Sequence, residues 1–177
     1  TVKMMECVEA VYEEEIEGAT AEHEEEEQYD EHVWTSPLNA MKIAEAIKDA
    51  VVKADNSGAA AYEANFEKYA AELKRLDESF TAFWSGTQQK VMLFGDRFPL
   101  RYYADRYGIQ YYAAFPGCAS QTEPSAATML FLQRKIKELN LGTIFYIEFS
   151  NHSIADALSE ATGAKTAQFN TCHTVSK

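Results

Sequence analysis

The 177-residue chain is long enough for about one domain, and its 46% hydrophobic residues are enough for a packed core. Its net charge of -12 arises in residues 1–31, which hold 13 acidic residues and one lysine, whereas residues 32–177 hold 15 residues of each sign. Because the chain has neither a basic cluster nor an apolar run of about 18 residues, its composition argues against a nucleic-acid partner and against a membrane span.

The first segment of the chain predicts little packed structure. The chain begins without Met, and we expect it to be a fragment or a processed form of a longer protein. Val2–Val8 is a short apolar segment that we expect to form a strand. Glu13–Glu31 has no hydrophobic face and its like charges repel, so we expect a solvated loop. The carboxylates and His23 of this loop are also suited to holding divalent cations weakly, and the two interpretations are compatible.

Two long helices are predicted after the acidic segment. Ser36 and Pro37 are typical of a helix start, with Ser as the N-cap and Pro at the first helical position. Apolar residues then recur at helical spacing up to a break at Asp55–Gly58. A second apolar stripe, with spacings of three and four, runs from Tyr62 to Phe83 and predicts one long packed helix. At about 1.5 Å per residue this helix would be a rod of roughly 40 Å.

Short β-rich segments alternate with helical segments from Lys90 onward. The predicted strands are Val91–Phe94, Ile109–Phe115, Thr143–Phe149 and Lys165–Phe169. The predicted helices begin at Pro99, Pro124 and Ser153, and Gly108 and Gly163 are expected to end two of them. This alternation predicts an α/β fold, in which a long scaffold helix is followed by a four-stranded parallel sheet with helices on both faces.

Polar residues follow each predicted strand of this sheet. They are Gly95–Arg97, Pro116–Glu123, Ser150–His152 and Asn170–His173. Because ligands bind at the carboxyl ends of parallel strands, we expect a binding site at this edge. His32, one of four histidines, lies between acidic residues and Trp34, just before the first helix start. We predict that His32 is a metal ligand and that it faces this edge of the sheet.

Residues 29–37 carry a recognisable motif. Tyr-Asp-Glu-His-Val-Trp-Thr-Ser-Pro resembles the Asp-Pro-His-Val-Trp-x-x-Pro motif of the metal-specific solute-binding proteins of ABC importers for zinc and manganese. The resemblance continues in order through Ala61–Asn65, Phe98–Tyr102, Tyr107-Gly108, Glu123–Ser125 and Ala161–Lys165. The segments Phe94–Tyr102 and Cys172-His173 look most like a Gram-positive gut-bacterial branch of this family.

The resemblance implies the C-terminal lobe of a two-lobe protein, with the N-terminal lobe largely missing from this chain. Residues 1–31 would be a remnant strand and acidic loop, 32–86 the metal-motif and scaffold helices, and 87–177 the C-terminal α/β lobe. The implied protein is not an enzyme. It is a monomeric, membrane-anchored lipoprotein at the cell surface that captures Zn²⁺ (or Mn²⁺) and passes it to the membrane permease of an ABC importer.

The same resemblance implies a set of metal ligands. His32 matches the histidine of the motif, and the first histidine of the family would lie upstream of Thr1. Many relatives have a His or Glu where this chain has Gly95, so Asp96 is the nearest candidate carboxylate, with capping of the next helix as its alternative role. The family's last ligand, an Asp, falls within Asn170–His173, where His173 is the better ligand. With half of the ligand set absent, we expect weak metal binding by this chain.

Cys172 has two possible roles. As a thiolate it would favour zinc, and in an oxidising compartment it would form a disulfide with Cys118, which also follows a strand of the sheet. Its position favours the disulfide. Glu123 and Glu148 are interpreted as structural, the second as a hydrogen-bonding partner of groups around the site. His152 is interpreted as an exposed or capping histidine.

Two other functions are considered. A metal-dependent hydrolase would need three protein ligands, an open coordination position and a general base, and no His-Glu-x-x-His spacing or comparable motif is present. A surface interaction protein with a vestigial metal site is the second alternative, because Gly95 and Asn170 depart from the family pattern. An assay for catalytic turnover would distinguish a hydrolase from a solute-binding protein. A measurement of zinc affinity would distinguish a vestigial metal site, which should bind zinc only weakly.

Overall fold

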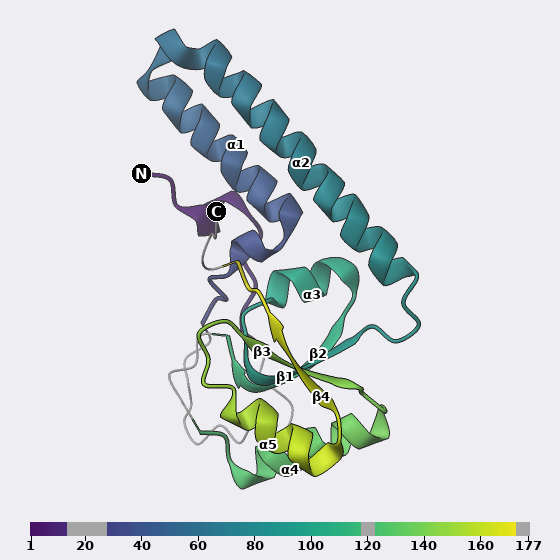
Figure 1. Cartoon of the computed structure of the whole chain (residues 1–177). Helices are drawn as coiled ribbons and strands as arrows, with labels where there is room; N and C mark the ends of the chain where they lie inside the picture. The colour runs from purple at the N-terminus through teal and green to yellow at the C-terminus, as the bar shows by residue number, and fades with distance from the viewer. Residues whose placement is uncertain (14–27, 118–122, 173–177) are drawn as a thin grey trace.

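Two long helices, α1 (Pro37–Ala54) and α2 (Ala59–Ser85), form an antiparallel hairpin that projects from an α/β lobe (Figure 1). The structure, a computed structural model, describes residues 1–13, 28–117 and 123–172. Asp55 closes the turn between the two helices, since its carboxylate accepts hydrogen bonds from the backbone and hydroxyl of Ser57. Within the described residues, no helix is both long and apolar enough to cross a bilayer.

The lobe is built on a four-stranded, all-parallel sheet in the order β2-β1-β3-β4. Its strands are β1 (Val91–Phe98), β2 (Gln110–Pro116), β3 (Thr143–Ile147) and β4 (Lys165–Phe169). The connecting helices are α3 (Arg101–Tyr107), α4 (Ala126–Glu138) and α5 (Ser153–Thr162). The predicted α/β class and the four parallel strands are confirmed.

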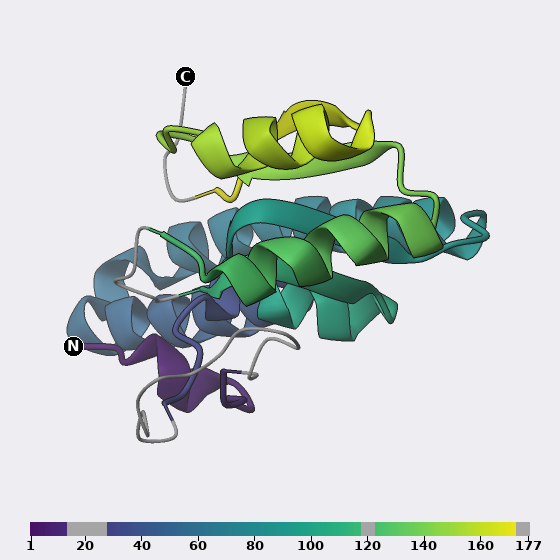
Figure 2. The same ribbon diagram turned by 90° about the horizontal axis from the view of Figure 1, so that it is seen from below.

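Helices cover both faces of the sheet, as predicted. One face packs against α3 and the end of α2, and α4 and α5 lie side by side across the other (Figures 1 and 2). Because successive side chains of a strand point to opposite faces, Phe94 belongs to the first core and Leu93 to the second. Both side chains are almost fully buried.

The predicted helix boundaries have clear local causes. Pro37 is the first residue of α1, and the carbonyl of Ser36 accepts from the backbone N–H of Ala40. The Ser36 side chain makes no capping hydrogen bond. Gly108 and Gly163 end α3 and α5 with φ of 66° and 81°, a left-handed conformation that favours glycine.

Two expectations about local structure are wrong. Val2–Val8 is not a strand, because Met4–Cys7 forms a 3-10 helix that packs near α1. The predicted long helix is formed as α2, but its apolar stripe is also not buried as one face, since Tyr69, Leu76 and Phe83 are 51%, 43% and 63% exposed. The predicted acidic loop lies mostly outside the described residues; at its ends Tyr12 and Tyr29 form an antiparallel bridge.

A polar contact fixes α2 to the lobe. Asp77 of α2 accepts two hydrogen bonds from the guanidinium of Arg106, at 2.9 and 2.7 Å, and a third from the Tyr107 hydroxyl at 2.9 Å. The bonds from Arg106, together with that from Tyr107, hold the pKa of Asp77 below its ordinary value. The scaffold helix is therefore anchored to α3 by a buried carboxylate as well as by apolar packing.

Candidate metal-binding site

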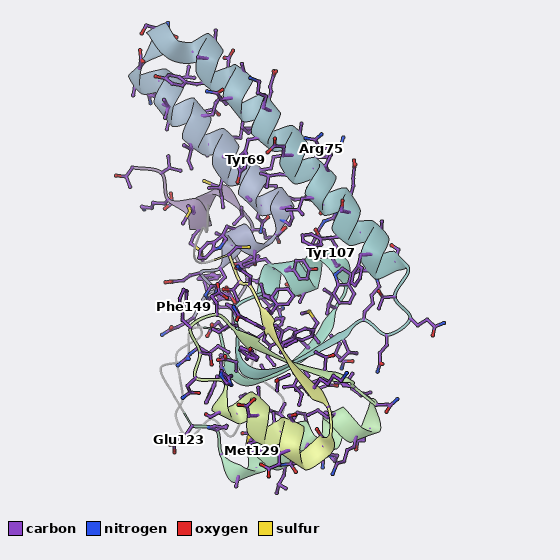
Figure 3. The ribbon with its side chains drawn as sticks, in the orientation of Figure 1. Tyr69, Arg75, Tyr107, Glu123, Met129 and Phe149 are labelled. Atoms are coloured by element: carbon purple, nitrogen blue, oxygen red, sulfur yellow. The ribbon has the colours of Figure 1, made fainter. Side chains whose placement is uncertain are left out.

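A cavity of about 290 Å³ lies at the carboxyl edge of the sheet. Its lining residues come from the ends of all four strands and from the loop before α1: His32, Arg97, Pro99, Gly117, Ile147, Glu148, Phe149 and Thr171. Figure 3 shows Phe149 on the side of the lobe nearer to the base of the hairpin. The cavity therefore lies between the loop that carries His32 and the carboxyl ends of the strands.

His32 is held in this cavity by its neighbour Asp30. The Nδ1 atom of His32 donates to Asp30 Oδ1 at 2.9 Å, and the backbone N–H of His32 donates to the same oxygen at 2.7 Å. Asp30 and His32 are only 2% and 8% exposed. A carboxylate on one ring nitrogen is the usual partner of a metal-binding histidine, because it fixes the tautomer and the ring orientation. A metal ion would then be bound through Nε2.

Glu148 and Thr171 form part of the opposite wall. The backbone N–H and the hydroxyl of Thr171 donate to the two carboxylate oxygens of Glu148, at 3.0 and 2.8 Å. Glu148 follows the last residue of β3, and Thr171 comes two residues after the end of β4. The predicted hydrogen-bonding role of Glu148 is confirmed, but Glu148 also lines the same cavity as His32. The sequence predicts a strand up to Phe149, whereas β3 ends at Ile147, and this earlier end places Glu148 at the edge of the sheet.

Asp96 lies beneath this edge and is 3% exposed. Its Oδ2 accepts from the backbone N–H of Ile147 at 3.1 Å, and its Oδ1 accepts from the backbone N–H of the next residue, Arg97, at 2.8 Å. The carboxylate therefore ties the end of β1 to β3, and Asp96 is not among the residues that line the cavity. It does not cap the next helix either, because α3 begins at Arg101 with Leu100 as its N-cap.

Position 95 cannot carry a metal-binding side chain in this fold. A Cβ added to Gly95 would lie 2.6 Å from the Cα of Ala155 on α5, a separation that real Cβ atoms do not show. Gly95 therefore faces the helix that packs beneath the sheet. A glycine at position 95 therefore allows the close approach of β1 and α5.

The end of the described chain holds the remaining candidates. Cys172 is exposed and has φ of 61°, and its backbone N–H donates to the Asn170 side chain at 2.8 Å. Cys172 forms no disulfide with another described residue, and its predicted partner Cys118 lies outside the described residues. His173 also lies outside them. Among residues 1–13, 28–117 and 123–172, no three His, Cys, Asp or Glu residues are grouped so that they could hold a metal ion.

The other histidine of this edge is engaged elsewhere. His152 precedes α5, and its Nδ1 pairs with the carboxylate of Asp156 at 2.8 Å. The side chains of both residues are about half exposed. The interpretation of His152 as an exposed histidine at a helix start is confirmed.

A parallel-sheet lobe attached to a long helix, with a buried histidine facing the sheet edge, defines the chain as part of a two-lobe solute-binding protein. The protein family described as ZnuA, zinc-uptake complex component A, periplasmic, matches residues 1–177 of the chain. The chain belongs to this family.

Individual relatives agree with this assignment. The high-affinity zinc uptake system protein ZnuA of Bacillus subtilis (strain 168) is 32% identical over 175 residues, covering 92% of this chain and 53% of that protein. The crystal structure of the metal-dependent lipoprotein YcdH from Bacillus subtilis has 31% identity and a TM-score of 0.71, covering 89% of this chain and 59% of the other. The laminin-binding protein Lbp of Streptococcus pyogenes has 26% identity and a TM-score of 0.74, covering 84% and 58%. The chain thus spans about half the length of the ZnuA relative.

Proposed function

We propose that this chain is the metal-binding C-terminal part of an extracytoplasmic protein that captures zinc and delivers it to the permease of an ABC importer. The family described as a zinc-uptake component and the ZnuA relative named for high-affinity zinc uptake support this proposal. Zinc is the preferred cargo over manganese because the proposed ligands include imidazole nitrogen and a thiol, which suit Zn²⁺ better than Mn²⁺.

The observation that carries the proposal is the pairing of His32 with Asp30 inside the cavity. A neutral imidazole whose Nδ1 donates to a carboxylate is a good zinc ligand through Nε2. On the opposite side of the cavity, Glu148 supplies a carboxylate whose negative charge favours a cation. Burial of His32 limits competition from water, so an ion bound there would be partly desolvated.

The proposed ligands differ in how readily each would reach the ion. His32 lines the cavity, and its Nδ1 is paired with Asp30. Cys172 and His173 directly follow Thr171 in the sequence, and Thr171 lines the cavity. Asp96 would first have to release the backbone N–H of Ile147. We therefore propose His32, His173 and Cys172 as ligands ahead of Asp96.

The proposed location is the cell surface, where a lipid anchor supplied by a longer protein would hold a monomer beside its permease. The description of the YcdH structure as a lipoprotein supports the anchor. The proposed division of the chain keeps its boundaries: an N-terminal segment (1–31), in which a 3-10 helix replaces the predicted remnant strand, the motif and scaffold helices (32–86), and the lobe (87–177). Transport without turnover is proposed, and assays for hydrolysis would test it.

A zinc titration of this chain tests the function. We expect one equivalent of Zn²⁺ to bind with micromolar affinity, with NMR shifts at His32 and Glu148, and Mg²⁺ at the same concentration to produce none. Binding is expected to be weak because part of the ligand set lies in the other lobe. Zinc binding that leaves the signals of both residues unchanged would contradict the proposal, as would the absence of binding.

A surface interaction protein is the second candidate, and the similarity to the laminin-binding protein Lbp favours it. The two functions do not exclude one another, since the laminin binding protein (Lmb) of Streptococcus agalactiae is described as bifunctional, with adhesin and metal transporting activity. Immobilised laminin tests it: binding that is unaffected by His32→Ala would support an adhesive role separate from the metal site.

A further inference from the structure

The hydroxyl of Tyr102 connects the lobe to the segment that precedes His32. Tyr102 lies on α3, and its hydroxyl donates to the backbone carbonyl of Asp30 at 2.7 Å. The same oxygen accepts from the backbone N–H of Val11 at 3.2 Å. Tyr102 is 5% exposed, and burial raises the pKa of its hydroxyl, which therefore stays protonated and able to donate near neutral pH.

The backbone of Asp30 is hydrogen-bonded to Val11 as well as to Tyr102. Its N–H donates to the carbonyl of Val11 at 2.9 Å, so Val11, Asp30 and Tyr102 form a closed set of three hydrogen bonds. The side chain of Asp30 in turn accepts both hydrogen bonds from His32. The position of the His32 ring thus depends on Asp30, and the position of Asp30 depends on Tyr102.

The ring of Tyr102 has a separate role from its hydroxyl. It packs in a small core with Val33 and Ile43, against which Trp34 and the N-terminal segment also pack. Removal of the oxygen alone would leave this apolar contact in place. The two roles are therefore separable by experiment.

We propose that Tyr102 is a positioning residue for the metal site, whose hydroxyl fixes the Asp30–His32 loop against the lobe so that the His32 ring faces Glu148 and Thr171. This inference rests on the proposed zinc function. Groups that orient a metal ligand without touching the ion commonly change metal affinity by about 10- to 100-fold when they are removed. Tyr102 acts one step further away, through Asp30, so we expect an effect at the lower end of that range.

The test compares Tyr102→Phe with Tyr103→Phe. Tyr103 is the next residue on α3, is also buried, and its hydroxyl accepts from Trp84 Nε1 at 2.8 Å, away from the cavity. Both variants remove one buried hydroxyl from the same helix. We expect both to lower the melting temperature, and only Tyr102→Phe to weaken Zn²⁺ binding, by about 10-fold. Equal zinc affinity of Tyr102→Phe and wild type, or an equal loss in both variants, would overturn the proposal.

A metal-free measurement separates this inference from the proposed function. The ¹⁵N signals of the His32 ring, assigned with His32→Ala, report its tautomer and its hydrogen bond to Asp30. We expect Tyr102→Phe to shift these signals without metal and Tyr103→Phe to leave them unchanged. If the wild type fails to bind zinc but the signals shift, the positioning role stands and the zinc function fails. If zinc binds and the signals do not shift, the positioning role fails.

Discussion

Asp30 Oδ1 accepts hydrogen bonds from both the ring Nδ1 and the backbone N–H of His32, at 2.9 and 2.7 Å. This arrangement fixes the side chain and the backbone of His32 with one buried carboxylate. It explains how a histidine that leaves an acidic segment is kept in a single orientation at the edge of the sheet. It also makes His32 the first residue to test.

His32→Ala is expected to weaken zinc binding at least 10-fold, because loss of a ligand removes a direct bond to the ion. The matched control is His152→Ala, which removes a histidine that pairs with Asp156 outside the cavity. Isothermal titration of both variants is the measurement. Wild-type affinity in His32→Ala, or an equal loss in His152→Ala, would show that His32 is not a ligand.

Glu148→Gln tests the opposite wall of the cavity. The change removes a negative charge and one of the two oxygens that accept from Thr171, so we expect a loss of about 1–2 kcal/mol in the free energy of unfolding. We also expect about 10-fold weaker zinc binding, since the carboxylate and the Thr171 segment both border the cavity.

The control for Glu148→Gln is Glu138→Gln, in which an exposed carboxylate paired with Arg134 is neutralised. It is expected to change neither quantity by more than about 0.5 kcal/mol. Urea unfolding and zinc titration give the two values. Should Glu148→Gln bind zinc like the wild type, the wall opposite His32 would consist of other groups.

Gly95→Ala is expected to destabilise the lobe by about 1–3 kcal/mol, because the new Cβ would collide with the backbone of Ala155. Gly95→His, which introduces a residue that the family resemblance implies at this position, is expected to destabilise the lobe further without improving zinc affinity. Gly142→Ala is the control, since a Cβ there meets nothing within 4 Å. Tighter zinc binding by a folded Gly95→His variant would show that β1 and α5 separate more easily than their packing indicates.

Asp77→Asn is expected to lower the free energy of unfolding by about 2 kcal/mol, because it breaks the ion pair with Arg106. This expected loss of stability is smaller than for a fully buried ion pair, because the Arg106 side chain is 37% exposed. Asp49→Asn, whose carboxylate is 67% exposed beside Lys48, is the control. An effect of Asp77→Asn no larger than that of Asp49→Asn would mean that apolar packing alone holds α2 to α3.

The ion pair of Asp77 with Arg106 also predicts that the stability of the fold depends on pH. The folded protein holds the pKa of Asp77 below its ordinary value of 3.8, so the unfolded chain takes up the proton first as the pH falls. The contribution of Asp77 is therefore complete above about pH 5 and is lost as the pH falls through the lowered pKa. The difference between wild type and Asp77→Asn should be constant from pH 7 to about pH 5 and shrink below about pH 4. A difference that does not change with pH in urea unfolding would contradict this.

Local signals in the sequence were sufficient for most elements of the fold. Pro37 fixes the start of α1 because proline lacks the N–H that a first helical residue leaves unbonded, and Gly108 ends α3 because its left-handed conformation favours glycine. The strands were found from short apolar segments, and their alternation with helices required a parallel sheet. That topology predicts the carboxyl edge as the binding edge, and the motif around His32 predicts that this histidine faces it.

Contacts between distant elements decided the rest. Whether Gly95 can be replaced depends on how closely α5 crosses β1, and the partner of Glu148 lies 23 residues further along the chain. The contact of Tyr102 with Asp30 spans 72 residues. No local pattern encodes such pairings, because they arise from the relative placement of whole helices and strands. The sequence by itself determined the elements and their order, because these depend on local patterns, and it predicted His32 as a candidate ligand. Only the tertiary structure decided which side chains surround that histidine and hold it in place.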